Sequence, residues 1–238
     1  QERTAALRVN EMFMAVLSQD LRTPLMSIMA AASVLKRQPD TDKVGAMADT
    51  VLSSGQRMGR MIEDLLDVTR IRHVGGLALK LGTANWQDVV QRTLKEVQTS
   101  YPHRAIDTQL EGELEGTWDG ERLCQVMTNL VGNAIQHGCS DEPVHIAVDG
   151  LESARVSVSV TNSGATIAPD LRPHLFDPFR GGERPPGRHE GLGLGLFIAH
   201  QLVRAHGGTI QVQSHDGTTC FRVDLPRRVA ASGTRVQM

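Results

Sequence analysis

A three-four spacing of apolar residues in the first 72 positions most constrains the fold of this chain. Seven apolar residues and the polar Ser54 follow this spacing over Val44, Met47, Val51, Ser54, Met58, Met61, Leu65 and Val68. The preceding segment repeats it at Met14, Leu17, Leu21, Pro24, Ile28, Ala31 and Leu35. Such spacing places one apolar stripe along each of two helices. Turn residues over 38–42 separate the two stripes, so the sequence predicts a helical hairpin.

This hairpin needs a packing partner, because two helices alone offer too small a core for stripes of this length. Two hairpins that pair as a four-helix bundle would bury both stripes. We therefore predict a homodimer through residues 1–72. The alternative is a hairpin that packs on the remainder of its own chain.

The remaining residues have a different pattern from about Gly75 onward. Alternation and β-branching predict strands over 77–81, 145–148, 155–160, 209–213 and 220–225. Helical spacing predicts helices over 86–99, 121–136 and 194–205. This mixture predicts an α+β protein, in which the hairpin is followed by an α/β sandwich over 73–228. We expect a hinge over 73–76 and a loose tail over 229–238.

Composition excludes several classes of partner. A net charge of −2 gives no electrostatic reason to expect nucleic acid. No apolar run approaches the roughly 20 residues of a membrane span, so we expect no membrane contact by this chain. Its three cysteines, Cys124, Cys139 and Cys220, are widely spaced. We expect reduced thiols in a cytoplasmic protein. Because residue 1 is not methionine, we expect a fragment of a longer chain.

An exposed polar cluster is predicted on the first helix. Residues 13–24 read Phe-Met-Ala-Val-Leu-Ser-Gln-Asp-Leu-Arg-Thr-Pro. Gln19 lies off the apolar stripe, Asp20 is next to it, and Thr23 follows one helical turn later. Pro24 removes one backbone hydrogen bond, so we expect a bend at this cluster.

This segment resembles the phosphoacceptor box of the sensor histidine kinases, with one departure. Gln19 stands where that family has its reactive histidine. An amide has no nucleophilic ring nitrogen, so it cannot accept a phosphoryl group as imidazole does. By resemblance, Asp20 would help to position or deprotonate the acceptor, and Thr23 would orient a water molecule for phosphatase chemistry.

Residues 125–137 resemble the N box of the same kinases. Asn129 and Asn133 are four residues apart and face the same way on one helix. Amide oxygens are hard ligands that suit Mg²⁺ beside phosphate oxygens, which makes Asn133 the candidate magnesium ligand. Gln136 occupies a position that is often basic in the family, and His137 one that is often aromatic.

Residues 161–167 follow a predicted strand and resemble the G1 box. The box has an aspartate that accepts a hydrogen bond from the adenine amino group. Here that position is Asn162, followed by Gly164 and Ile167. The amide oxygen can accept the same bond without charge, so selection of adenine is expected to be weaker.

Three further motifs complete the resemblance. Residues 175–179 match the F box, which ends at Phe179 and is followed by Arg180, a candidate phosphate or acceptor-helix contact. The G2 box opens a predicted helix, where glycines let backbone N–H groups approach phosphate. Its candidate ATP-binding residues are Gly191, Leu192, Gly193, Leu194 and Gly195. Thr218 lies in the final Gly-Thr turn, and residues 181–190 are a candidate lid.

The resemblance spans roughly residues 10–226. It implies an ATP-binding domain of the gyrase, chaperone, histidine kinase and mismatch-repair type, with ATP and Mg²⁺ as ligands. It also implies a phosphotransferase whose partner is the receiver domain of a response regulator. Gln19 leaves three hypotheses: an engineered replacement in an ordinary kinase, a natural pseudokinase scaffold, or a response-regulator phosphatase that uses Asp20 and Thr23.

Overall fold

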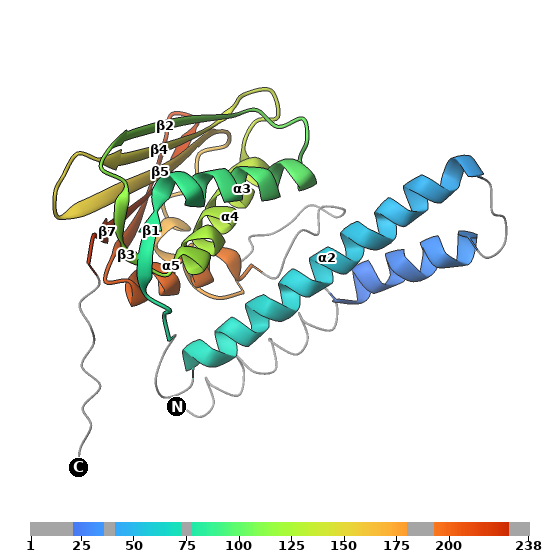
Figure 1. The fold of residues 1–238 in the computed structure, drawn as a ribbon. Coiled ribbons are helices and arrows are strands. Elements are labelled where there is room, and N and C mark those ends of the chain that lie inside the picture. The colour runs from blue at the N-terminus through green and yellow to red at the C-terminus, as the bar shows by residue number, and fades with distance from the viewer. Residues whose placement is uncertain (1–20, 36–40, 73–77, 180–192, 229–238) are drawn as a thin grey trace, which may run out of the picture. The chain divides into compact units, whose positions relative to one another are not determined.

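The chain forms two compact units, and the first boundary between them lies between Arg70 and Ile71. The structure, a computed structural model, describes residues 21–35, 41–72, 78–179 and 193–228. The first unit contains a helical hairpin, and the second unit, Ile71–Asp177 with Leu196–Met238, contains the α/β fold (Figure 1). Pro178–Gly195, which includes the described residues Phe179 and Gly193–Gly195, is grouped with the first unit.

The hairpin consists of a helix over residues 21–35 and the helix α2 (Thr41–Arg72). Its packed face is the predicted apolar stripe. Four stripe residues are buried, namely Pro24, Ala31, Met61 and Val68. Others are half-buried, and only Val44 among the described stripe residues is exposed. The prediction of a helical hairpin is therefore confirmed.

Helical backbone continues through Thr23 and Pro24. Pro24 is buried and Thr23 is exposed, which is the orientation that the predicted register requires. The turn of helix before Pro24 falls within residues 1–20, outside the described residues, so the bend stays a prediction.

The α/β unit is built on one sheet of five strands in the order β2-β4-β5-β7-β6. These strands are β2 (Ile106–Gly112), β4 (Val144–Gly150), β5 (Arg155–Ser163), β6 (Thr209–His215) and β7 (Thr218–Pro226). Strands β2 and β4 are parallel, and the other neighbours are antiparallel. A second sheet pairs β1 (Gly82–Asn85) with β3 (Glu115–Trp118). The prediction of an α+β protein is confirmed.

Three helices lie on one face of the large sheet (Figure 1). They are α3 (Trp86–Ser100), α4 (Gly120–His137) and α5 (Gly195–Ala205). Alternate residues of a strand point to opposite faces. On β4 and β5 the even-numbered side chains, such as Ile146 and Val158, are therefore buried under the helices. The odd-numbered side chains are mostly polar and form the outer face of the sheet.

The prediction of a strand over 77–81 is wrong for residues 78–81, which are the ones that the structure describes. Residues 78–81 are not extended in a sheet, and strand β1 begins at Gly82. The backbone N–H of Lys80 donates instead to the Asp119 carboxylate at 2.8 Å. Pairing with β3 decides where β1 lies, and no local pattern reports that pairing. Strands β2 and β3 are absent from the sequence prediction, although Ile106, Thr108 and Leu110 alternate with polar residues.

Candidate functional site

The start of α4 is held by a network that orients the whole helix. Asp119 caps the helix: one carboxylate oxygen accepts from the backbone N–H of Arg122 at 3.2 Å and the other from Lys80. The Asp119 N–H donates to Nε2 of the fully buried His206 at 3.1 Å. The His206 Nδ1–H donates to the Leu202 carbonyl at 2.8 Å. Burial lowers the pKa of His206, which favours this neutral tautomer.

The N-box side of α4 carries polar groups without partners among the described residues. Apolar residues of the helix pack on the sheet, whereas Asn129 and Asn133 are half-buried on the other side. The Asn129 amide nitrogen is buried and has no hydrogen-bond acceptor in the described part of the chain. Leaving such a donor unpaired is costly, so an acceptor supplied by a ligand would stabilise it. The Asn133 side chain likewise makes no hydrogen bond to a described residue.

Asn162 lies at the end of β5, on the face that the helices cover, and is 4% exposed. Its amide nitrogen donates to the Ser163 carbonyl at 3.2 Å. The amide oxygen accepts no hydrogen bond from a described residue. The side chain therefore offers one buried acceptor, as the sequence predicts for a base-recognition position.

Two glycines let α4 and the G1 segment approach each other closely. Gly138 and Gly164 form an isolated antiparallel bridge. A Cβ on Gly164 would lie 2.7 Å from the His137 carbonyl oxygen, and one on Gly138 would lie 2.4 Å from the Ala134 carbonyl oxygen. Only glycine fits such contacts with backbone atoms. The fold thereby brings His137, Asn162 and Gly164 to one place.

The β6–β7 hairpin holds the G1 segment from the other side. Asp216 and Gly217 both have positive φ, 48° and 73°, which is the pattern of a two-residue type I′ turn. Gly217 then accepts from the Gly164 N–H at 2.7 Å through its carbonyl oxygen. Thr218 pairs with Ser163, so this predicted residue also borders the G1 segment.

A buried hydroxyl pair anchors Ile167, and sequence reasoning missed it. The Ile167 N–H donates to the Ser214 hydroxyl at 2.8 Å. Ser214 and Thr219 are both buried, and their hydroxyl oxygens are 2.9 Å apart. The hydroxyls lie on neighbouring strands β6 and β7. Their sequence signal is only two polar residues at inward positions of strands.

The F box is fixed to the α/β unit by ring contacts. Phe176 stacks on His200 of α5, with ring centroids 5.1 Å apart, and meets Phe221 of β7 edge-on at 6.4 Å. Burial, followed by the charge of Arg204, lowers the pKa of His200. Phe179 has a φ of 64°, a strained conformation for a non-glycine residue.

The G2 box leads into α5 as predicted. Gly193 adopts a positive φ of 66°, Leu194 is buried, and Gly195 is the first residue of the helix. The N–H groups of a first helical turn lack intrahelical partners, which makes them available to anionic groups. Gly191 and Leu192, like Arg180, lie outside the described residues.

Arg104 is a further residue near the site that the sequence did not indicate. A Cβ placed on Gly138 would lie 3.2 Å from an Arg104 terminal nitrogen and 3.2 Å from the Asn162 Cβ. The Arg104 Nε is buried without an acceptor among the described residues. Arg104 therefore lies close to the base-recognition position of the G1 box.

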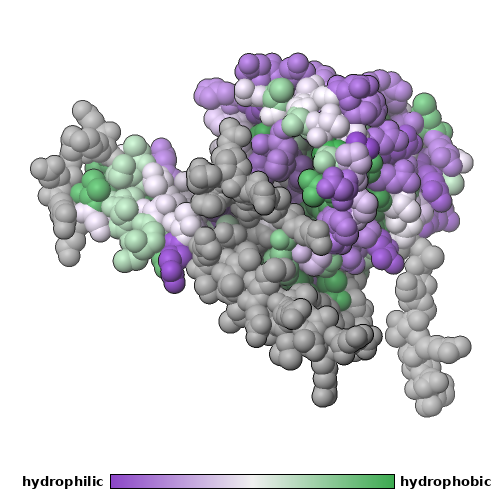
Figure 2. All heavy atoms as spheres, turned by 180° about the vertical axis from the view of Figure 1, so that it is seen from behind, coloured by the Kyte–Doolittle hydropathy of each residue, from purple (hydrophilic) through white to green (hydrophobic). Residues whose placement is uncertain are grey.

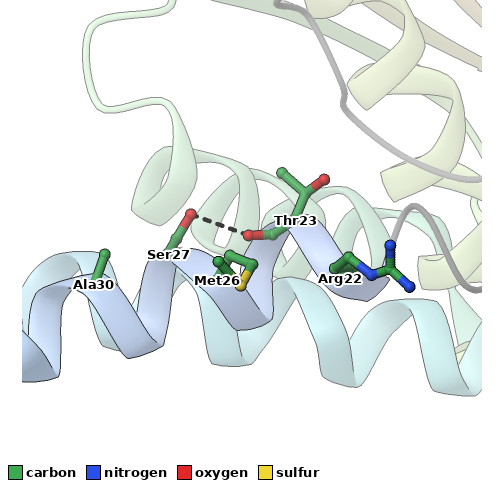
Figure 3. Close-up of a pocket in the computed structure, with 5 residues that line it drawn as sticks. All are labelled: Arg22, Thr23, Met26, Ser27 and Ala30. Carbon is green, nitrogen blue, oxygen red and sulfur yellow. Dashed lines mark hydrogen bonds between the residues drawn. The ribbon is translucent and has the colours of Figure 1, made fainter.

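On the hairpin, the helix over 21–35 presents a pocket (Figure 3). It is lined by Arg22, Thr23, Met26, Ser27 and Ala30, which share one helix face. The Ser27 hydroxyl donates to the Thr23 carbonyl at 3.2 Å, so Ser27 turns inward along the helix. The Thr23 side chain is exposed on this face. Gln19 and Asp20 lie outside the described residues.

Comparison with known proteins decides the family. Residues 9–74 match the His Kinase A (phospho-acceptor) domain, and residues 118–229 match the histidine kinase-, DNA gyrase B- and HSP90-like ATPases. The chain belongs to the sensor histidine kinases. The family implies that this kinase core binds ATP through residues 118–229.

Individual relatives agree with this assignment. The kinase core is 30% identical over 228 residues to a bacteriophytochrome of Pseudomonas aeruginosa, and the match covers 95% of this chain and 31% of the relative. The chain spans less than two thirds of the length of the first curated relatives it matches.

Solved structures support the fold. The histidine kinase AdeS of Acinetobacter baumannii has a TM-score of 0.66 at 21% identity, and the match covers 87% of this chain and 96% of that one. The histidine kinase ThkA, in complex with the response regulator protein TrrA, has a TM-score of 0.66 at 22% identity. That match covers 94% of this chain and 64% of the other. Within the described residues of the kinase core, no helix is both long and apolar enough to cross a membrane.

The described residues of the kinase core fit a nucleotide. An unpaired buried donor at Asn129, an unpaired acceptor at Asn162 and a cradle of glycines at Gly138 and Gly164 lie in one unit. Asn133 offers an uncommitted amide oxygen, a ligand type that Mg²⁺ accepts. Gln136 is half-buried and His137 exposed on the last turn of α4.

Proposed function

We propose that this chain is the catalytic core of a two-component sensor histidine kinase and acts in the cytoplasm. The observation that carries the proposal is the unpaired N-box amide of Asn129 on α4, the helix that ends at the glycine cradle around Asn162. The acceptor-box helix in the other unit is the second element of such a kinase. The chain would bind ATP and serve phosphoryl transfer to a response regulator aspartate.

The described residues of the candidate site have separate roles in nucleotide binding. Asn162 would accept a hydrogen bond from the base, and Asn129 would donate one to a phosphate oxygen. The resemblance of Gly193–Gly195 to the G2 box predicts that their backbone N–H groups also bind phosphate. Asn133 would hold Mg²⁺, which neutralises charge on the phosphate oxygens when bound. Thr218 and Ile167 hold the G1 segment in place.

In the family reaction an imidazole nitrogen attacks the γ-phosphorus, the bond to the bridging oxygen breaks, and ADP leaves. The Gln19 amide nitrogen shares its lone pair with its carbonyl group, so it cannot form the nitrogen–phosphorus bond. We therefore expect this chain to bind ATP and to be deficient in autophosphorylation.

The proposed partners are a second copy of the chain and a response regulator receiver domain. Green spheres gather on the described part of the hairpin, whereas the α/β unit is mainly purple (Figure 2). Exposed apolar residues include Met29, Leu52, Ile62 and Leu66, which a four-helix bundle would cover. The pocket around Thr23 and Met26 is the proposed docking surface for the receiver domain (Figure 3).

Incubation with γ-labelled ATP and Mg²⁺ tests the proposal. We expect no label on the chain as it stands and label on Gln19→His. The double variant Gln19→His with Asn133→Ala is the control and should lose the label. An unlabelled Gln19→His chain that still binds ATP would contradict an intact kinase core.

A second candidate activity is dephosphorylation of the regulator, favoured by the exposure of Thr23 on the acceptor helix. With Asp20, Thr23 could orient a water molecule without any histidine. A phosphorylated regulator should then lose phosphate faster with this chain than without it, and more slowly with Thr23→Ala. Equal rates with and without the chain would leave the pseudokinase scaffold as the alternative.

A further inference from the structure

Arg104 differs from the structural arginine of the same unit. Arg227 is buried, and its guanidinium donates to the carbonyl oxygens of Glu113, Glu115, Gly150 and Glu152. Arg104, in contrast, makes no side-chain hydrogen bond or ion pair with a described residue. Burying the Nε of a guanidinium without a hydrogen-bond acceptor destabilises the folded protein. The position of Arg104 is therefore better explained by a ligand than by support of the fold.

The place of Arg104 is set by the backbone on either side of it. Its N–H donates to the Tyr101 carbonyl at 3.1 Å, and Ala105 accepts from the Val144 N–H at 3.0 Å. The residue thus precedes β2 and lies against the end of α4. The point where a Gly138 Cβ would stand is within 3.2 Å of both the guanidinium and the Asn162 Cβ. Gly138 therefore leaves the space between these two side chains open.

Asn162 and Arg104 together present an acceptor next to donors. The Asn162 oxygen is unpaired among the described residues, and the guanidinium carries N–H donors only. Adenine displays a matching pair around its amino group: the amino group donates, and a ring nitrogen on one side of it accepts. These nitrogens are N1, bonded to C6, and N7, bonded to the neighbouring C5. Asn162 lacks the charge of the carboxylate usual at its position, so a charged donor beside it adds affinity for the base.

We propose that Arg104 is a specificity-determining residue of the nucleotide site, whose guanidinium donates a hydrogen bond to N1 or N7, the adenine ring nitrogens that flank the amino group. The inference rests on the proposed function, because it requires a purine in the pocket that Asn162 borders. A purely structural role is the competing explanation, in which the positive charge of Arg104 stabilises the C-terminal end of α4.

Calorimetric titration with ADP, 1-deaza-ADP and 7-deaza-ADP distinguishes the two roles. The original chain should bind one deaza analogue about tenfold more weakly than ADP, because a hydrogen bond from a charged donor is lost. Arg104→Met should weaken ADP binding by about tenfold and bind ADP and that analogue equally. The matched control is Arg92→Met, which removes a half-exposed arginine paired with Glu121 at 4.0 Å and should change neither affinity.

The outcomes separate the inference from the proposed function. If the original chain binds no adenine nucleotide, the proposed function fails. If it binds ADP and both analogues equally, or if Arg104→Met keeps the discrimination, Arg104 does not read the base. Arg104→Lys, which retains the charge at the end of α4, covers the case in which the methionine variant does not fold. Arg104→Lys should also lose most of the difference in affinity between ADP and the deaza analogue. A purely electrostatic role of Arg104 predicts that this difference is fully retained.

Discussion

At the scale of single residues, the glycine cradle is the most demanding feature of the site. We expect Gly164→Ala to weaken ADP binding by at least about tenfold and to destabilise the α/β unit by roughly 1–3 kcal/mol. The reason is the 2.7 Å approach of the new Cβ to the His137 carbonyl oxygen, a backbone atom that cannot move aside. Calorimetric titration and chemical unfolding measure the two effects.

Gly132→Ala is the matched control for that substitution. Gly132 lies inside α4, and nothing in the described part of the chain stands within 4 Å of the point where a Cβ would be. Alanine there should stabilise the helix by about 0.5–1 kcal/mol. Equal effects of the two substitutions would show that the cradle does not need a glycine.

His206 makes the stability of the α/β unit depend on pH. Burial lowers its pKa below the ordinary value of 6.5, so the folded protein favours the neutral ring. Its contribution is complete above pH 6.5 and is lost as the pH falls through the folded pKa. Protonation of Nε2 would also break the hydrogen bond that the Asp119 backbone N–H donates to it.

We therefore expect the free energy of unfolding of the α/β unit to fall by about 1 kcal/mol from pH 7.5 to pH 5. In His206→Gln this pH dependence should be smaller, although the variant is less stable throughout. His215→Gln is the control, since His215 is exposed in the β6–β7 hairpin. Identical slopes in all three chains would exclude His206 as the origin.

At the scale of elements, Arg227 ties the end of β7 to the turn after β4 and to β3. Its guanidinium bonds four carbonyl groups, and its backbone N–H donates to the Ala154 carbonyl at 3.0 Å. Arg227→Ala should cost roughly 3 kcal/mol or more, because several buried carbonyl groups lose their donors. Arg228→Ala, at an exposed neighbour, should cost little. Chemical unfolding followed by fluorescence of Trp118 measures both.

Helix α2 holds an acidic group with the opposite pH dependence. Burial, with the charges of Asp67 and Glu63, raises the pKa of Asp64 from 3.8 to about 7, against a lowering by Arg60. The stability that it contributes is therefore complete below pH 3.8 and is lost as the pH rises through about 7. Asp64→Asn should stabilise the hairpin at pH 8 by about 1–2 kcal/mol, given its partial exposure.

Thermal unfolding followed by helical circular dichroism, at pH 4 and pH 8, measures the stabilisation by Asp64→Asn. Asp49→Asn on the same helix is the control, since Asp49 is exposed. A gain that is equal at the two pH values would point to helix propensity instead of the pKa of Asp64.

At the scale of the whole molecule, α2 has a second face with three-four spacing. All of its members are exposed in the single chain: Gly45, Ala48, Leu52, Gly55, Gly59, Ile62 and Leu66. Each helix of a four-helix bundle packs against two neighbours, so we assign this second face to the partner copy. Ile62→Glu with Leu66→Glu should convert a dimer into a monomer, measured by sedimentation. Leu151→Glu, at a residue 71% exposed in the α/β unit, should remain dimeric.

Much of the fold could be predicted from local patterns. Helices α3 and α4 have apolar spacing and strong caps at Asn85 and Asp119, and β4, β5, β6 and β7 alternate clearly. Strand β1 was misplaced because pairing with β3 decides its position. Strand β2 is a mostly polar edge strand, and it lies parallel to β4 only because the intervening α4 crosses the sheet.

The sequence by itself determined the hairpin stripe, the family and the motif residues of the site, because each depends on spacing along the chain. Tertiary structure alone decided that Arg104 lies beside Gly138 and Asn162, that His206 reaches the cap of α4, and that Ser214 meets Thr219. These contacts join residues on different elements. Their partners are chosen by sheet order and helix packing, which no local pattern of residue types encodes.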